Sequence, residues 1–294
     1  MKLRLIPGCA ALAGVLMIVQ GGPSGLAQQA PTPTGQAATI GDLTGYWVSV
    51  VNQDWYFRMI TPPKGQYAQV PINAAARKVA DTFDPAQYGG TNYQTSGIID
   101  CRAYGAAGLM HMPMRLHITW ASPDVLKIET DWGEQTRLFH FNPGRPYGDL
   151  EQALRNGEAG TSHGPASMQG YSVAMWEQPF QYNAAFQRGP QRGGGGLGTS
   201  RINEAQSGGS LAVLTTDLTP GWLRRNGIPY SARTRVIEHY RVFQDPTGKQ
   251  WLNAANEVVD PEYLTRPFFT TADFQKEPDG SKWVPHPCKK VAGD

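Results

Sequence analysis

The sequence lacks a long apolar segment, a cluster of basic residues and the pattern of a long amphipathic helix. The mostly apolar run from about Leu5 to Val19 is short and interrupted by Gly and Pro, so we expect no stable membrane span. The formal net charge is +2, and without a basic cluster we expect no binding to nucleic acid or anionic lipid. Abundant Gly, Pro and aromatic residues instead favour an all-β domain with long loops.

The motifs of several enzyme and metal-site classes are also missing. The sequence contains no GxSxG, HxH or HExxH segment, and no dinucleotide, haem or iron–sulfur signature. We therefore expect no zinc site and no resident cofactor.

The first residues have the organisation of a secretory signal peptide. Lys2 and Arg4 precede the apolar run, and the small-residue segment Gly25–Ala27 follows it. We expect cleavage after Ala27 and a location in the periplasm or outside the cell. Removal of residues 1–27 takes away two of the 26 basic residues and none of the 24 acidic ones, which leaves a neutral chain.

The mature chain would keep only Cys101 and Cys288. Two cysteines in an exported protein predict one disulfide. Closing so long a loop contributes about 4–5 kcal/mol in the chain-entropy model. The alternative is a pair of unpaired buried thiols.

The remaining pattern predicts a flexible linker over residues 28–40 and a single β-barrel domain over residues 41–294. Asn73 to Asp81 predicts a short helix, because Asn73 can cap it and its alanines favour helix. Strand patterns lie at 45–51, 54–60, 115–120, 125–131, 135–142, 168–176, 210–218, 235–243, 250–259 and 268–276. Sequential strands of this kind close best as an antiparallel, lipocalin-like barrel of about 8–10 strands; a two-sheet sandwich is the alternative.

Residues 143–209 are expected to be a long loop or insertion. They include four consecutive glycines, Gly193 to Gly196, which do not hold one backbone conformation without a large entropic cost. Such a loop is usually either functional or disordered, so it is a disordered insertion or a lid over the barrel mouth.

The strand pattern at Arg235–Phe243 places a carboxylate on an apolar face, because Val236, Glu238, Tyr240 and Val242 alternate along it. In a barrel this face would point inward, where a carboxylate needs a partner or must stay protonated. A buried carboxylate beside a phenol is also suited to general acid–base catalysis.

Arg137 is a candidate partner for an interior carboxylate. Glu129 and Arg137 lie opposite one another if the loop between them spans residues 132–134, whereas a two-residue loop places Glu129 opposite Thr136. The alternative to a reactive cluster is a structural ion-pair network, or a register that turns these groups to water. The candidate catalytic residues are Glu238, Tyr240, Arg137, His117 and Glu129.

Aromatic residues on the expected strands suit the wall of a pocket for an apolar or aromatic ligand. Some of them are expected to fill the core instead, and Trp176 also lies on an expected strand. The candidate ligand-binding residues are Trp47, Trp55, Tyr56, Trp120, Tyr171, Trp251 and Glu257.

The segment MHMPM combines Met110, Met112 and Met114 with His111. Thioether and imidazole ligands favour copper, and the periplasm is a compartment in which copper is handled. Methionine is also a common apolar filler, and no second Met/His cluster completes a site. Copper binding is therefore an alternative rather than the leading interpretation.

The order of several short segments resembles a large, mostly uncharacterised group of exported bacterial proteins with a lipocalin-like barrel. The resemblance spans most of the mature chain, and it implies export and a single β-rich domain without an established activity. The Gly-rich insertion before Ser210 departs from many relatives and puts a shared mouth geometry in doubt. The matching segments are LTGYW at 43–47, CRAYG at 101–105, Glu129, Arg137, GYSVAMWE at 170–177, IEHY at 237–240, DPEYLTRPF at 260–268 and Cys288.

Together these observations predict a periplasmic barrel that binds a small apolar or aromatic molecule. The alternative is a cofactor-independent lyase, isomerase or hydrolase. In that case Glu238 would act as acid or base, Tyr240 would donate a hydrogen bond and Arg137 would stabilise an anion. The oligomeric state is left open.

Overall fold

The computed structural model describes residues 35–88, 100–141, 163–177 and 209–289. These residues belong to one compact unit, Pro33–Asp294. The expected signal peptide, the four-glycine run and much of the expected long loop lie outside the described residues. Among the helices that the structure describes, none has both the length and the apolar character needed to cross a membrane.

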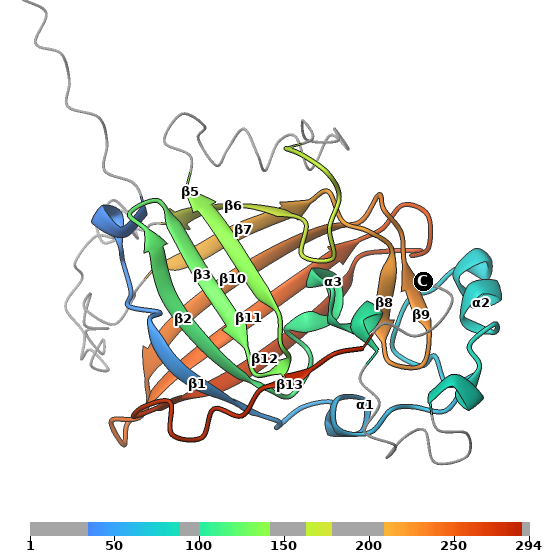
Figure 1. The fold of residues 1–294 in the computed structure, drawn as a ribbon, viewed down its shortest axis with the longest axis horizontal. Helices are drawn as coiled ribbons and strands as arrows, with labels where there is room; N and C mark the ends of the chain where they lie inside the picture. Colours follow the sequence, from blue (N-terminus) through green and yellow to red (C-terminus); the bar gives the residue numbers. More distant parts are fainter. Residues whose placement is uncertain (1–34, 89–99, 142–162, 178–208, 290–294) are drawn as a thin grey trace, which may run out of the picture. The chain divides into compact units, whose positions relative to one another are not determined.

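Nine strands form a closed barrel, as Figure 1 shows. Around the barrel the order is β1-β12-β11-β10-β7-β6-β5-β3-β2. The strands are β1 (Gly45–Val50), β2 (Arg115–Ser122), β3 (Val125–Thr130), β5 (Thr136–Phe141), β6 (Tyr171–Glu177), β7 (Ser210–Thr216), β10 (Arg235–Gln244), β11 (Gln250–Val259) and β12 (Phe268–Glu277). The expectation of a closed β-barrel is therefore confirmed.

One pair in this barrel departs from the expected antiparallel arrangement. β5 and β6 run parallel, with Phe139 aligned to Ser172, whereas the other neighbouring pairs are antiparallel. A closed ring with an odd number of strands cannot alternate direction throughout, so at least one pair must be parallel. The chain makes this pair through the long connection from β5 to β6, because parallel neighbours need a crossover rather than a hairpin.

The local predictions succeed where a single pattern dominates. Asn73 caps α2 (Ala74–Ala80) by accepting a hydrogen bond from the backbone N–H of Ala76, as its sequence predicts. The expected strand at residues 54–60 is wrong, because Trp55–Met59 forms the short helix α1. The expected linker is also partly structured, since Gly35–Ala38 forms the 3-10 helix η1.

We call the barrel end near η1 the mouth and the opposite end the base. At the base, β1 leads into α1, and η4 (Cys101–Tyr104) and α3 (Ala106–Leu109) precede β2. The hairpin of β8 (Gly221–Arg224) and β9 (Ile228–Tyr230) follows β7 at the same end (Figure 1). The remaining elements are η2 (Pro85–Tyr88), β4 (Trp132–Gly133) and β13 (His286–Pro287), with β4 paired to β13.

The predicted disulfide between Cys101 and Cys288 is present. It joins η4 to the residue that follows β13, across 187 positions of the sequence. The bond therefore ties the final described segment to the elements that cover the base.

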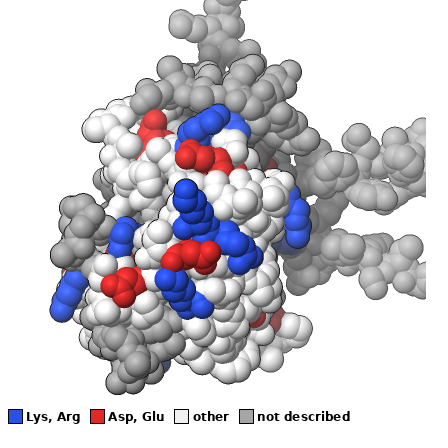
Figure 2. Space-filling view, turned by 90° about the vertical axis from the view of Figure 1, so that its right-hand side faces the viewer, with Lys and Arg blue, Asp and Glu red and all other residues white. Residues whose placement is uncertain are grey.

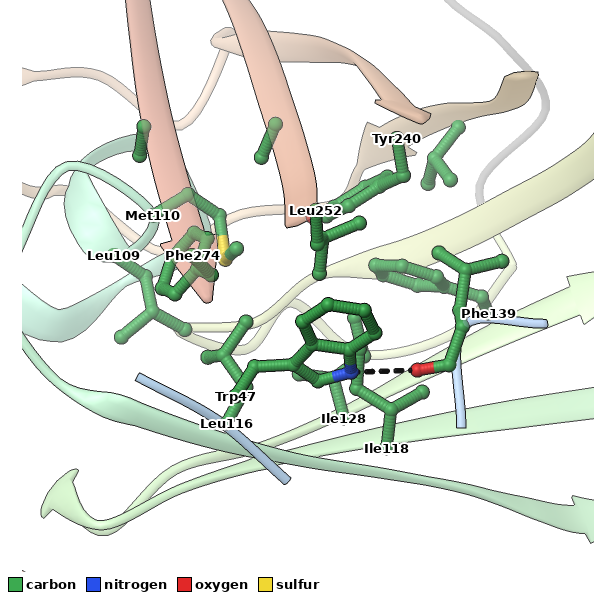
Figure 3. Close-up of a cluster of buried hydrophobic side chains, with 14 of the residues drawn as sticks. Trp47, Leu109, Met110, Leu116, Ile118, Ile128, Phe139, Tyr240, Leu252 and Phe274 are labelled. Atoms are coloured by element: carbon green, nitrogen blue, oxygen red, sulfur yellow. Dashed lines mark hydrogen bonds between the residues drawn. The ribbon is translucent and has the colours of Figure 1, made fainter. Parts of the chain in front are cut away.

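Buried apolar side chains fill the interior of the barrel. Figure 3 shows Trp47 surrounded by aliphatic and aromatic side chains, with its indole N–H donating to the carbonyl oxygen of Leu43 at 2.8 Å. Leu109 and Met110, from the segment before β2, belong to the same buried cluster. Burial of these side chains supplies the main apolar contribution to stability.

Candidate functional site

The alternation predicted for β10 places Glu238 and Tyr240 inside the barrel. Val236, Glu238 and Tyr240 are buried, while the intervening Ile237 and His239 are less buried and lie on the outer face. β10 is held between β7 and β11, so this inward face meets side chains from across the barrel.

The register of the β3–β5 hairpin decides which side chain meets Glu238. Glu129 pairs with Thr136, and Ile128 pairs with Arg137. Of the two registers that the sequence allowed, the structure therefore adopts the one in which Glu129 faces Thr136. Arg137 points into the barrel with Ile128, and Glu129 lies on the outside.

Arg137 and Glu238 form a two-bond ion pair that is completely buried. Arg137 Nη1 donates to Glu238 Oε1 at 2.7 Å, and Nη2 donates to Oε2 at 2.5 Å. The Tyr240 hydroxyl also donates to Oε1 at 2.8 Å. Arg137 Nη2 reaches Thr215 Oγ1 at 3.0 Å, and Thr215 in turn contacts Ser172 Oγ at 2.7 Å.

The electrostatics of this group stabilise the ion pair. Burial alone would lower the pKa of Arg137, but the charge of Glu238 and the contact with Tyr240 raise it above its ordinary value. Burial and the negative charge of Glu238 raise the pKa of Tyr240. Arg137 and Tyr240 thus remain protonated near neutral pH, and Glu238 serves as acceptor for both.

This geometry favours the structural interpretation of Glu238 over a catalytic one. Both carboxylate oxygens already accept hydrogen bonds, and the side chains of Glu238 and Arg137 have no exposed surface. A general base must reach the proton that it removes. Reaction at Glu238 would therefore require the ion pair to open and the surrounding core to rearrange.

His117 and Glu129 do not join this group. Both lie on the outer face of the barrel, where His117 Nδ1 is 3.2 Å from Glu129 Oε2. Lys127 also approaches Glu129, and Tyr46 stacks on His117. The expectation of a single catalytic cluster does not hold for these two residues, because His117 of β2 and Glu129 of β3 pair with one another on the outer face.

The predicted ligand-binding residues separate into three groups. Trp47 and Trp120 lie on the inner face of the barrel, Trp47 in the core and Trp120 toward the mouth. Trp55 and Tyr56 belong to α1 and do not line the barrel, and Trp55 is 59% exposed. The remaining three alternate with inward residues and point outward; they are Tyr171, Trp251 and Glu257.

The mouth carries an aromatic cluster that the sequence identified only in part. Trp120 and Phe141 have ring centroids 5.5 Å apart, and Phe141 and Trp176 have centroids 5.8 Å apart. Trp120 and Trp176 are partly buried and pack against the barrel core. Phe141 was missed, although it follows Arg137 and Phe139 at the alternating positions of an inward face.

The MHMPM segment contributes to the core. Met110, Met112 and Met114 are buried in the main apolar cluster, as expected of methionine used as a filler. His111 is also buried, and burial together with Arg58 and Arg224 lowers its pKa to about 3. Two nearby guanidinium groups make these surroundings unfavourable for a copper cation.

Comparisons with protein-family models, with curated proteins and with solved structures found no match. Within the described residues, no group of three or more His, Cys, Asp or Glu side chains could hold a metal ion. The interpretation of the site therefore rests on the geometry of the chain itself.

Proposed function

We propose that this chain is an exported barrel protein that binds a small apolar or aromatic molecule at the barrel mouth. The location in the periplasm or outside the cell, and membership of a lipocalin-like group, are part of the same proposal. The aromatic cluster of Trp120, Phe141 and Trp176 is the observation that carries it.

The mouth supports binding better than the deeper interior does. Trp120 and Trp176 keep accessible surface while packing against the buried core, so their rings are already positioned for a flat ligand. Trp176 is further held by its indole N–H, which donates to the carbonyl oxygen of Gly35 at 2.8 Å. Deeper in the barrel, Phe139 and Tyr240 are almost fully buried against their neighbours, so a ligand there would have to displace them.

Two measurements test this proposal. Native mass spectrometry of the purified mature protein should reveal any organic molecule that is retained from the cell. Titration with the neutral fluorophore N-phenyl-1-naphthylamine then measures binding directly. We expect saturable binding by the wild type.

Variants of two tryptophans locate the bound probe. Trp120→Leu should weaken binding by about two- to tenfold, because one aromatic contact contributes about 0.5–1.5 kcal/mol. Trp251→Leu is the matched control, since Trp251 is a partly buried strand residue on the outer face. Equal affinity in both variants, or no binding by the wild type, would contradict a ligand site at the mouth.

A further inference from the structure

The helix α1 at the barrel base places its side chains in an unusual way. Its single arginine, Arg58, is its one fully buried residue, whereas Trp55 and Met59 are 59% and 54% exposed. A short surface helix ordinarily turns its apolar residues toward the core and its charge toward water. The inward position of Arg58 therefore needs a physical explanation.

Arg58 reaches the base of the barrel through two hydrogen bonds. Its Nε donates to the carbonyl oxygen of His111 at 2.9 Å, and its Nη2 donates to Ser49 Oγ at 2.9 Å. Its Nη1 is buried and has no hydrogen-bond partner. Both acceptors are uncharged, so no direct contact neutralises the positive charge of the guanidinium group.

The end of β8 brings two more arginines to the same region. Arg224 is 3% exposed, and its guanidinium lies 4.1 Å from the ring centroid of Phe57, the neighbour of Arg58. Arg224 Nη1 donates to the carbonyl oxygen of Ala68, but its buried Nε has no partner. Arg225 Nη2 donates to the carbonyl oxygen of Arg58 at 3.2 Å.

His111 adds two further unpartnered nitrogens. It is 7% exposed, and both its Nδ1 and its Nε2 are buried without hydrogen bonds. Arg58 and Arg224 both lie within electrostatic reach of its ring. A buried polar atom without a partner costs about 1–3 kcal/mol. Several such nitrogens in one region therefore indicate that a binding partner is missing.

No carboxylate is positioned to neutralise these arginines. Within the described residues, Arg58, Arg224 and Arg225 form no ion pair, and Asp54 and Asp273 act only at longer range. Burial lowers the pKa of Arg224 to about 10 and also lowers that of Arg58. Figure 2 shows basic and acidic side chains close together on the face of the molecule that lies at the right of Figure 1, whereas Arg58 and Arg224 are buried.

We propose that Arg58, His111 and Arg224 form a binding site for a doubly charged tetrahedral oxyanion, phosphate or sulfate. Two guanidinium charges match the charge of such an anion. The free Nη1 of Arg58, the free Nε of Arg224 and an N–H of His111 are the donors that it requires. A flat monocarboxylate would satisfy fewer donors and neutralise one charge only.

The bound oxyanion has a structural role in this proposal. Arg58 is the one fully buried residue of α1, so an anion that holds Arg58 also helps to hold the helix against the base. The site lies at the opposite end of the barrel from the aromatic mouth, and it does not depend on the function proposed for that mouth.

Isothermal titration of the mature protein with inorganic phosphate, in phosphate-free buffer at constant ionic strength, tests the proposal. We expect saturable binding with a Kd below about 1 mM and competition by sulfate. Acetate should bind at least about tenfold more weakly, because it presents one charge and fewer acceptor atoms. Hydrogen exchange should show that phosphate slows the amides of α1.

Variants separate this site from general ion binding. Arg58→Met should weaken phosphate binding by about tenfold or more, because it removes a charged donor. Arg241→Met, which changes an exposed arginine on β10, should bind as the wild type does. His111→Gln should also weaken phosphate binding, and it tests the proposal if Arg58→Met does not fold. No saturable phosphate binding by the wild type, or equal binding by His111→Gln and Arg241→Met, would overturn the proposal.

Discussion

Arg137 and Arg58 are two arginines that the fold hides almost completely, at 1% and 0% exposure. Arg137 donates two hydrogen bonds to the carboxylate of Glu238, which neutralises its charge. Arg58 donates to a carbonyl and a hydroxyl and contacts no carboxylate. Each arginine has one buried nitrogen without a partner, so the carboxylate is what distinguishes them. The two arginines are therefore equally buried but differ in their partners. Arg137 is neutralised by a carboxylate of the core, whereas Arg58 is left with a charge that a bound anion could neutralise.

The same comparison separates a buried polar group that stabilises the fold from one that could bind a ligand. The Arg137–Glu238 pair drew attention in the sequence because a carboxylate interrupts an apolar face. Its geometry leaves no donor or acceptor aimed at a substrate apart from the buried Nε of Arg137. The arginines at the base carry the stronger indication of binding, because no carboxylate among the described residues forms an ion pair with Arg58 or Arg224.

The largest expected effect comes from breaking the buried ion pair of Arg137 and Glu238. Arg137→Met should destabilise the fold by about 3–5 kcal/mol, because Glu238 would remain as an uncompensated buried charge. The double variant Arg137→Met/Glu238→Leu should recover much of this loss. Urea unfolding of wild type, single and double variants measures both effects, and a single variant as stable as the double would contradict them.

Acidification tests the surroundings of His111 at the barrel base through their effect on its pKa. Its folded-state pKa is about 3 and its ordinary value is 6.5, so the unfolded chain takes up a proton first as the pH falls. Stability from this group is present above pH 6.5, and about 3 kcal/mol of it should be lost by pH 4.5. His111→Gln should show a shallower loss over this range in urea unfolding. A variant curve parallel to the wild type would argue against the low pKa.

A smaller effect is expected when the uncompensated charge itself is removed. Arg58→Met loses two hydrogen bonds but also removes a buried charge without a counterion, so stability in phosphate-free buffer should change by about 1 kcal/mol or less. Thermal unfolding with and without phosphate sharpens the comparison, since phosphate should raise the wild-type midpoint and not that of the variant. A loss as large as that of Arg137→Met would show that the two arginines are equivalent.

The smallest effect is expected on the outer face. Glu129→Gln removes contacts to His117 and Lys127, both partly exposed, and should cost about 0.5 kcal/mol. This carboxylate and Glu238 were both candidates for one cluster, so the pair of measurements compares an outer with an inner position. Urea unfolding at low and at high salt measures this loss of stability and how far salt screens it.

The expected strand at residues 54–60 illustrates the limit of local patterns. The segment DWYFRMI has the aromatic content of a strand, but a helical period places Trp55 and Met59 on one side and Arg58 on another. The contacts that hold Arg58 come from Ser49 and His111, which lie in other elements. A pattern within seven residues contains no information about these distant acceptors.

The pairing of Arg137 with Glu238 could be predicted only in part. Alternation along β10 was sufficient to place Glu238 and Tyr240 on the apolar face. The sequence left two registers open for the hairpin between Glu129 and Arg137. The structure adopts the one in which Arg137 pairs with Ile128, so that Arg137 and Glu129 lie on opposite faces. The choice was made by the whole barrel, because a one-residue slip would expose the apolar side chains of that strand.

By itself the sequence determined the positions of the nine barrel strands, the disulfide partners, the capped helix at Asn73 and the face on which Glu238 lies, since each depends on patterns along the chain. The tertiary structure decided the parallel β5–β6 pair, the inward turn of Arg137 and the meeting of Arg58, His111 and Arg224. These features join residues that are far apart in sequence. They follow from barrel closure and from the packing of loops on its base, which no local period encodes.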